Sequence, residues 1–134
     1  NLLISKWNTN ITNKCKSCTS QIENTKHLIF ECINVQNIWK EASRYLNFDI
    51  LWKHIVVGFY LDKSETTKIY NSFISYIAYR IYKSKMYCRI EQIDETCTFI
   101  KDHVKKSIKS HCLVLSLLCK TKEKKLFETF ISNL

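Results

Sequence analysis

Apolar residues recur at intervals of three and four along most of the chain, which is the spacing of one face of an α-helix. This spacing predicts helices over about residues 33–47, 65–89 and 91–119, and a short helix near residue 134. The apolar positions are Val35, Ile38, Trp39, Ala42, Tyr45 and Leu46; Ile69, Tyr70, Phe73, Ile74, Ile77 and Ile81; Ile93, Cys97, Ile100, Val104, Ile108, His111, Leu115 and Leu118; and Leu126, Phe127, Phe130 and Ile131. We expect the second and third helices to pack antiparallel.

Two segments lack a sustained helical period. Residues 1–14 place an apolar group before a polar Asn and Thr stretch, which predicts a short helical turn followed by a loop. Residues 48–61 are rich in β-branched and aromatic side chains, and they favour a strand or an extended connector.

Composition agrees with a mainly helical chain. There is one glycine and no proline, so the residues that most often form hairpins and tight turns are almost absent. Hydrophobic residues make up 46% of the 134 residues, which excludes intrinsic disorder and allows a buried core. A chain of this length forms one domain, or one domain with a small module attached.

The charge balance indicates a polyanionic partner. Twenty-one Lys and Arg residues oppose twelve Asp and Glu residues, which gives a formal charge of +9. The alternative for the charge alone is a basic protein that is simply soluble.

Cysteine usage indicates a reducing, intracellular setting. The chain has seven cysteines, an odd number that disulfide pairing cannot satisfy. No apolar run reaches the ~18 residues of a membrane span, so we expect no membrane association. The chain begins with Asn1 and its only methionine is Met86, so we expect it to be a fragment of a longer protein.

Three cysteines and one histidine have the spacing of metal ligands. Cys15, Cys18, His27 and Cys32 form the pattern C-x2-C-x8-H-x4-C. The short gap in the first pair lets both thiolates of one tight turn face the same ion, and four soft or borderline ligands complete a tetrahedron. The sequence therefore predicts one Zn²⁺ ion at this site.

A filled tetrahedron leaves no open coordination position for catalysis, so the predicted zinc is structural. Its binding free energy would supply the cohesion that a loop of this length lacks. The alternative is that the four residues are close in sequence by chance, and are buried or exposed as the fold requires.

The residues around this pattern resemble the zinc-binding region near the C-terminal end of reverse transcriptases from retrotransposons that lack long terminal repeats. Residues 2–7 resemble the family's lead-in helix, 15–18 its first knuckle, and 23–32 its acidic approach, histidine, apolar triplet and last cysteine. Trp39 matches the family's tryptophan, and residues 74–85 resemble the amphipathic helix that follows.

The resemblance covers about residues 1–40 closely and extends less closely to about residue 90. The chain departs from the family at Lys16, Thr19 and Ile33, where proline, glycine and proline are usual, so the turns around the ligands should differ. The resemblance implies a parent reverse transcriptase that copies element RNA at a nicked chromosomal target, with its polymerase domain elsewhere.

The chain has no acidic pair suited to polymerisation. Its four aspartates are scattered, and none is adjacent to another. Two-metal phosphoryl transfer needs carboxylates that converge, so we expect a non-catalytic segment.

Basic and aromatic residues gather beside the predicted zinc site and along one stripe of the second long helix. Lys and Arg neutralise phosphates, and tyrosine rings stack on unpaired bases. For the tyrosines, the alternative is packing at the edge of the core. The predicted nucleic-acid-binding residues are Lys14, Lys16, Lys26, Tyr76, Arg80, Lys83, Lys85, Tyr87 and Arg89.

These inferences predict a mainly α fold, with a small CCHC zinc knuckle in residues 1–40 and an antiparallel helical bundle in residues 41–134 packed on it. The expected function is that of a structural-zinc, nucleic-acid-binding accessory domain of a retrotransposon reverse transcriptase. It would position element RNA or target DNA for target-primed reverse transcription. The expected partners are RNA or DNA and the rest of the polypeptide, in cytoplasmic ribonucleoprotein and the nucleus. Two alternatives stay open: a zinc-stabilised protein-interaction module, and an inactive relic of an element.

Overall fold

The computed structural model describes residues 14–18, 22–58, 65–117 and 121–134, and helices make up most of them. The elements are η1 (His27–Glu31), α2 (Ile33–Leu46), α3 (Trp52–Val57), α4 (Glu65–Glu91), α5 (Cys97–Leu117) and α6 (Thr121–Asn133). Within the described residues there is no strand beyond an isolated bridge between Lys14 and Ile22. The prediction of a mainly helical chain is confirmed. The helical turn predicted for residues 1–14 lies outside the described residues, apart from Lys14.

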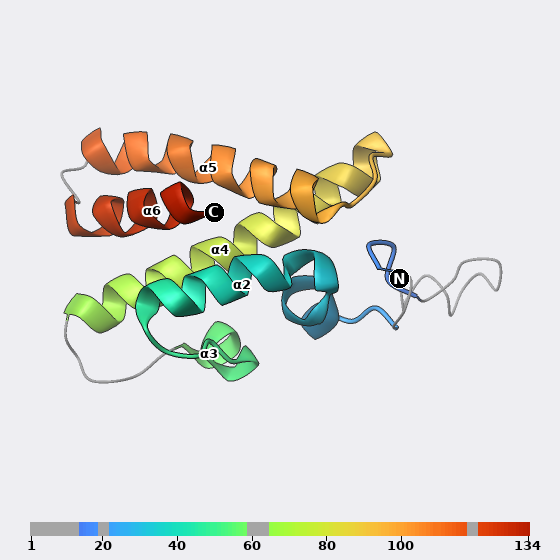
Figure 1. The fold of residues 1–134 in the computed structure, drawn as a ribbon, viewed down its shortest axis with the longest axis horizontal. Helices are drawn as coiled ribbons and strands as arrows, with labels where there is room; N and C mark the ends of the chain where they lie inside the picture. Colours follow the sequence, from blue (N-terminus) through green and yellow to red (C-terminus); the bar gives the residue numbers. More distant parts are fainter. Residues whose placement is uncertain (1–13, 19–21, 59–64, 118–120) are drawn as a thin grey trace.

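The long helices lie side by side, and a short turn joins α4 to α5 (Figure 1). α5 packs against α2, α4 and α6, and α3 packs against α4. The chain reverses direction between α4 and α5, and again between α5 and α6 (Figure 1). η1 lies where α4 ends and α2 begins, and it contacts both helices. Among the described helices, none combines the length and the apolar character that crossing a membrane requires.

The apolar faces of α2, α4, α5 and α6 meet in one core, as their spacing predicts. The ring of Phe73 on α4 lies 5.0 Å from that of Phe127 and 5.2 Å from that of Phe130, both on α6. Cys15 and Cys32 belong to the same buried cluster. The segment from Cys15 to Cys32, which carries the four predicted ligands and which we call the metal loop, is therefore continuous with the core. α2 runs through the module boundary that the sequence predicts at residue 40.

The prediction of a strand or extended connector is wrong for residues 52–57, which form α3. Its first turn is fixed locally, because Leu51 N–H donates to His54 Nδ1 at 2.9 Å and His54 N–H donates to Leu51 O at 2.9 Å. Gly58, with φ of 89°, ends it. A helix of six residues is too short to show a period, so β-branched composition gave the wrong assignment.

The helix predicted from residue 91 begins at Cys97 instead, because the chain turns between α4 and α5. Gln92 has φ of 56°, and Ile93 N–H donates to Cys88 O at 2.8 Å, which closes the end of α4. Thr96 then caps α5, since its Oγ1 accepts the Phe99 N–H at 3.1 Å.

Candidate metal centre

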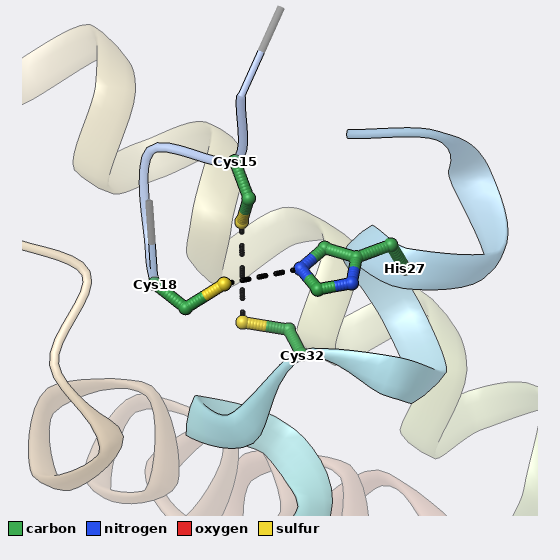
Figure 2. Close-up of side chains that lie close together, drawn as sticks. All are labelled: Cys15, Cys18, His27 and Cys32. Atoms are coloured by element: carbon green, nitrogen blue, oxygen red, sulfur yellow. Dashed lines mark hydrogen bonds between the residues drawn. The ribbon is translucent and has the colours of Figure 1, made fainter. Parts of the chain in front are cut away.

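Four side chains from two segments of the N-terminal loop converge at one point (Figure 2). The ligand atoms of Cys15, Cys18, His27 and Cys32 all lie within 4.8 Å of one another. Cys15 Sγ is 4.0 Å from Cys32 Sγ, and Cys18 Sγ is 3.2 Å from His27 Nε2. The structure therefore brings together all four predicted ligands, close enough to hold a metal ion.

These distances fit a tetrahedral ion better than they fit a disulfide. With metal–sulfur bonds of about 2.3 Å and metal–nitrogen bonds of about 2.0 Å, two ligand sulfurs lie roughly 3.8 Å apart and a sulfur and a nitrogen roughly 3.6 Å apart. A disulfide would need the two sulfurs at about 2.05 Å. The six described cysteines are all free thiols.

The first pair of ligands sits on a tight turn. The bridge between Lys14 and Ile22 holds the chain just before Cys15, and residues 16–18 form the turn. The backbone N–H groups of Ser17 and Cys18 point at Cys15 Sγ, where they stabilise a thiolate. A turn with inward amides thus forms without proline or glycine in residues 14–18.

The second pair of ligands is positioned by η1, a π-helical turn. Asn24 lies three residues before it, and Asn24 Oδ1 accepts the His27 N–H at 2.8 Å. Cys32 N–H then donates to His27 O at 2.9 Å, five residues back. This wide turn places the side chains of the H-x4-C pair on one side of the loop, and π turns of this kind recur at functional sites.

Burial makes the Cys15 thiol reluctant to ionise. Cys15 and Cys32 are fully buried, and desolvation raises the pKa of Cys15 to about 11, with the nearby Cys32 adding to the rise. The Ser17 and Cys18 amides and the charge of Lys85 act in the opposite direction. Because a metal ion must displace these protons, its binding should release protons and weaken at low pH.

His27 is oriented for coordination through Nε2. Its ring is buried, and Nδ1 has no hydrogen-bond partner among the described residues. Metal-bound histidines usually donate this second N–H to an acceptor. Here Asn24 fixes the backbone of His27 instead, by accepting its N–H.

The metal loop is fastened to the turn between α4 and α5 by a group of polar contacts. Ser17 Oγ donates to Glu95 O at 3.1 Å. Asn34, in the first turn of α2, donates from Nδ2 to Ser17 O at 3.0 Å and to Glu95 O at 2.8 Å. On the opposite side of the loop, Trp39 Nε1 donates to Ile29 O at 2.8 Å. The loop is therefore anchored to both α2 and the α4–α5 turn.

Arg89 at the end of α4 adds an ion pair with two carboxylates. Its Nη1 lies 3.0 Å from Glu23 Oε2 and its Nε lies 2.5 Å from Glu95 Oε1, and a second Arg89 nitrogen also contacts Glu23. Burial alone would raise the pKa of Glu23, but the hydrogen bonds and charge of Arg89 outweigh it and hold that pKa below its ordinary value. Arg89 thus joins the metal loop to two elements distant in sequence.

Three of the predicted nucleic-acid-binding lysines lie around the metal loop. Lys14, Lys16 and Lys26 are all exposed. Lys26 Nζ is 3.9 Å from Glu31 Oε2, a distance typical of a weak surface ion pair.

The predicted stripe on α4 is narrower than expected. Lys85 is fully buried and Arg89 is bound by two carboxylates, so neither side chain faces solvent for a phosphate, and including them was wrong. Arg89 is bound by Glu23 of the metal loop, and Lys85 lies close enough to Cys15 for its charge to act on that thiol.

The remaining stripe residues differ in exposure. Tyr76 is half-buried, donates from its hydroxyl to Ser107 O at 3.2 Å and stacks on His111. Arg80 donates from Nε to that hydroxyl at 3.0 Å and lies over the Tyr76 and Tyr79 rings. Lys83 and Tyr87 are exposed.

The predicted set of nucleic-acid-binding residues omits aromatic residues that lie on α4 and α5. Tyr79 and Tyr82 on α4 are 50% and 41% exposed. On α5, Phe99 and His103 stack against Tyr87, with ring centroids 6.2 Å and 5.2 Å away. A shallow hollow continues from these two rings along α5, and its remaining lining residues are Asp102, Lys105, Lys106 and Lys109. Only the packing of α4 against α5 brings the α5 residues beside Tyr87, so a helical projection of α4 alone does not find them.

Comparisons with known proteins identify no relative: no family model matches the chain, and no significant match was found among curated proteins or solved structures.

Proposed function

We propose that the Cys15, Cys18, His27 and Cys32 cluster binds one structural Zn²⁺ ion, as a CCHC knuckle fixed to an antiparallel helical bundle. Three thiolates and one imidazole form the ligand set that zinc prefers in closed tetrahedral sites. Two of the four side chains are fully buried and a third, His27, nearly so, which leaves little room for a substrate at the ion. The ion's part is to hold the loop on the bundle, and the segment itself is non-catalytic.

We propose further that the zinc-loaded protein binds RNA or DNA. The observation that carries this proposal is a set of exposed residues on the packed pair of α4 and α5: the rings of Tyr79, Tyr82 and Tyr87, with Lys83 Nζ 5.9 Å from the centre of the Tyr79 ring, and Lys106 on α5. We call these five residues the α4–α5 face. Exposed rings offer stacking platforms for unpaired bases, and lysines neutralise the phosphates between them. The formal charge of +9 favours such a partner over the whole molecule.

The resemblance of the knuckle and Trp39 to non-long-terminal-repeat elements supports a parent reverse transcriptase. In that setting the segment would hold element RNA or target DNA for catalytic domains elsewhere in the polypeptide. It would act in cytoplasmic ribonucleoprotein and in the nucleus. The rest of that polypeptide is then its second partner.

Fluorescence anisotropy with labelled single-stranded RNA and duplex DNA, across a range of salt concentrations, tests the binding proposal. We expect log K to fall linearly with log salt for the reduced, zinc-loaded protein. Lys83→Gln with Lys106→Gln should reduce the slope for single strands by about 1.4, because each phosphate contact contributes roughly 0.7. Tyr87→Ala should weaken single-strand binding by about 1–3 kcal/mol.

A matched control is Lys53→Gln with Lys68→Gln, which removes the same charge from exposed positions on α3 and at the start of α4. An equal loss of slope in both double variants would place the binding surface elsewhere. A Cys15→Ser and Cys18→Ser variant tests whether the metal organises the surface. The absence of binding at low salt by folded, zinc-loaded protein would overturn the nucleic-acid proposal.

One observation favours a second candidate, a zinc-stabilised protein-interaction module. Near the C-terminal end of α5, Leu113, Val114 and Leu117 are 70%, 50% and 84% exposed. Grouped aliphatic side chains in contact with solvent are typical of protein contacts. Failure to bind nucleic acid would favour this candidate or an inactive relic.

A further inference from the structure

Lys85 is a lysine in the interior of the protein. Its exposed fraction is 0%, although Tyr82 and Tyr87, its neighbours on α4, are exposed. Its Nζ has no hydrogen-bond partner among the described residues, and no described carboxylate forms an ion pair with it. Lysine is almost never fully buried unless it is paired, so its charge requires a partner that is not a carboxylate.

The surroundings of Lys85 point to the metal centre. Lys85, Cys88 and Arg89 are three and four residues apart and so share one face of α4. Arg89 on that face binds Glu23 of the metal loop, and Cys88 lines the same hollow as Cys15. The C-terminal part of α4 passes behind the four ligands in Figure 2, and α4 packs against η1. The charge of Lys85 acts on the thiols of both Cys15 and Cys88.

The charge of a loaded site supplies the missing partner. Three thiolates, one neutral imidazole and a divalent ion sum to a single negative charge. Carboxylates are absent from the cluster, and the buried Glu23 and Glu95 are already bound by Arg89. An uncompensated negative charge in the interior would be as unfavourable as the uncompensated ammonium.

We infer that the Lys85 ammonium is the counter-ion of the metal-bound thiolates, an inference that rests on the metal binding proposed above. The two charges are buried together and cancel, so Lys85 stabilises the loaded site from outside its ligand set. When the ion leaves, the metal-bound thiolates that compensate the ammonium are lost, and Lys85 Nζ has no hydrogen-bond partner among the described residues. Lys85 is then a buried cation without compensation, which disfavours the empty folded state.

The counter-ion role predicts that replacing Lys85 weakens zinc binding but does not destabilise the metal-free protein. In a zinc competition with a chromophoric chelator, Lys85→Met should weaken binding by about 10–100-fold, the usual cost of losing an outer partner of a metal site. In urea unfolding of metal-free protein, the same variant should be at least as stable as wild type. Lys85→Gln, which keeps a polar side chain without charge, should weaken zinc binding in the same direction.

The matched control is Lys68→Met, which makes the same charge change at an exposed position in the first turn of α4 and should change zinc affinity less than about 2-fold. Wild-type zinc affinity in Lys85→Met would overturn the counter-ion role alone. Weaker zinc binding together with a less stable metal-free protein would overturn it too, since Lys85 would then support the fold itself. If the wild-type protein bound no zinc, this inference and the proposed metal site would both fail.

Discussion

His103 on α5 is a histidine held in its neutral form by its surroundings. Its Nδ1 lies 2.7 Å from Ser84 Oγ on α4, and its ring stacks against those of Tyr87 and Phe99. Burial lowers its pKa from the ordinary 6.5, and the positive charges of Arg80 and Lys106 lower it further. The helix contact between α4 and α5 therefore includes a group that resists protonation.

We expect stability to depend on pH through His103. Its folded-state pKa is lowered, so the unfolded chain binds more protons below about pH 6.5, and this contribution to stability is lost as the pH falls from there through the folded pKa. Urea unfolding of the wild type should lose more stability between about pH 7.5 and pH 5.5 than that of His103→Gln. The metal centre is common to both proteins and cancels in the comparison. An NMR titration placing the His103 pKa above 6.5 would contradict this expectation.

At the scale of single elements, α2 and α4 end at left-handed residues that are not glycine. The chain has one glycine, and it follows α3. The left-handed residues after α2 and α4 are Asn47, with φ of 60°, and Gln92, with φ of 56°. Asparagine tolerates this conformation, whereas most other non-glycine residues adopt it at a cost of roughly 1–2 kcal/mol.

Gln92→Gly should therefore raise the free energy of unfolding by about 0.5–1 kcal/mol, because the relief of left-handed strain exceeds the greater chain entropy of glycine. Urea unfolding of the zinc-loaded protein is the measurement. Asn47→Gly serves as the control and should change stability by less than about 0.5 kcal/mol. A larger gain at position 47 than at position 92 would show that some other interaction sets the end of α4.

At the scale of the whole molecule, Arg89 is the tie between the metal loop and the helices. Its partners are both buried: the side chains of Glu23 and Glu95 are 4% and 3% exposed, and that of Arg89 is 16% exposed. Removing one member of a buried ion pair leaves the other charge without compensation, which usually costs about 3–5 kcal/mol.

Arg89→Met should lower the free energy of unfolding by about 3–5 kcal/mol, since two carboxylates would stay buried without a cation. Adding Glu23→Gln and Glu95→Gln should recover most of the loss, because the remaining groups are neutral. Chemical denaturation of the zinc-loaded variants measures both effects. A loss below about 1 kcal/mol in Arg89→Met would mean that water replaces the guanidinium and that the tie is weak.

Local patterns in the sequence predict what depends on near neighbours. The four ligands are found because each pair is set by one turn, C-x2-C or H-x4-C, and the helices over 33–46 and 65–91 follow from their apolar spacing. The start of α5 depends on a single capping residue, Thr96. The apolar spacing continues on its N-terminal side, so a prediction from that spacing places the start too early. α3 is shorter than two helical turns and shows no usable period.

The errors on α4 have a different physical origin. A helical projection places Lys85 and Arg89 beside exposed residues, and nothing within α4 indicates that they are covered. Glu23 is 66 residues from Arg89, so the covering loop is brought there only by the fold. Lys106 of the α4–α5 face escapes the projection of α4 for the same reason, because it lies on α5.

The shared contact at Glu95 has a dynamic consequence. Its carbonyl oxygen accepts hydrogen bonds from Ser17 in the metal loop and from Asn34 in α2, so three distant parts of the chain are joined at one backbone position. Segments joined in this way open and close as a single cooperative unit. Chelation should therefore be sensed beyond the knuckle, as faster amide hydrogen exchange in the α4–α5 turn, while the Phe73 region of the core keeps its slow exchange. The metal loop thereby sets the local opening rate of a turn that is more than 60 residues away in sequence.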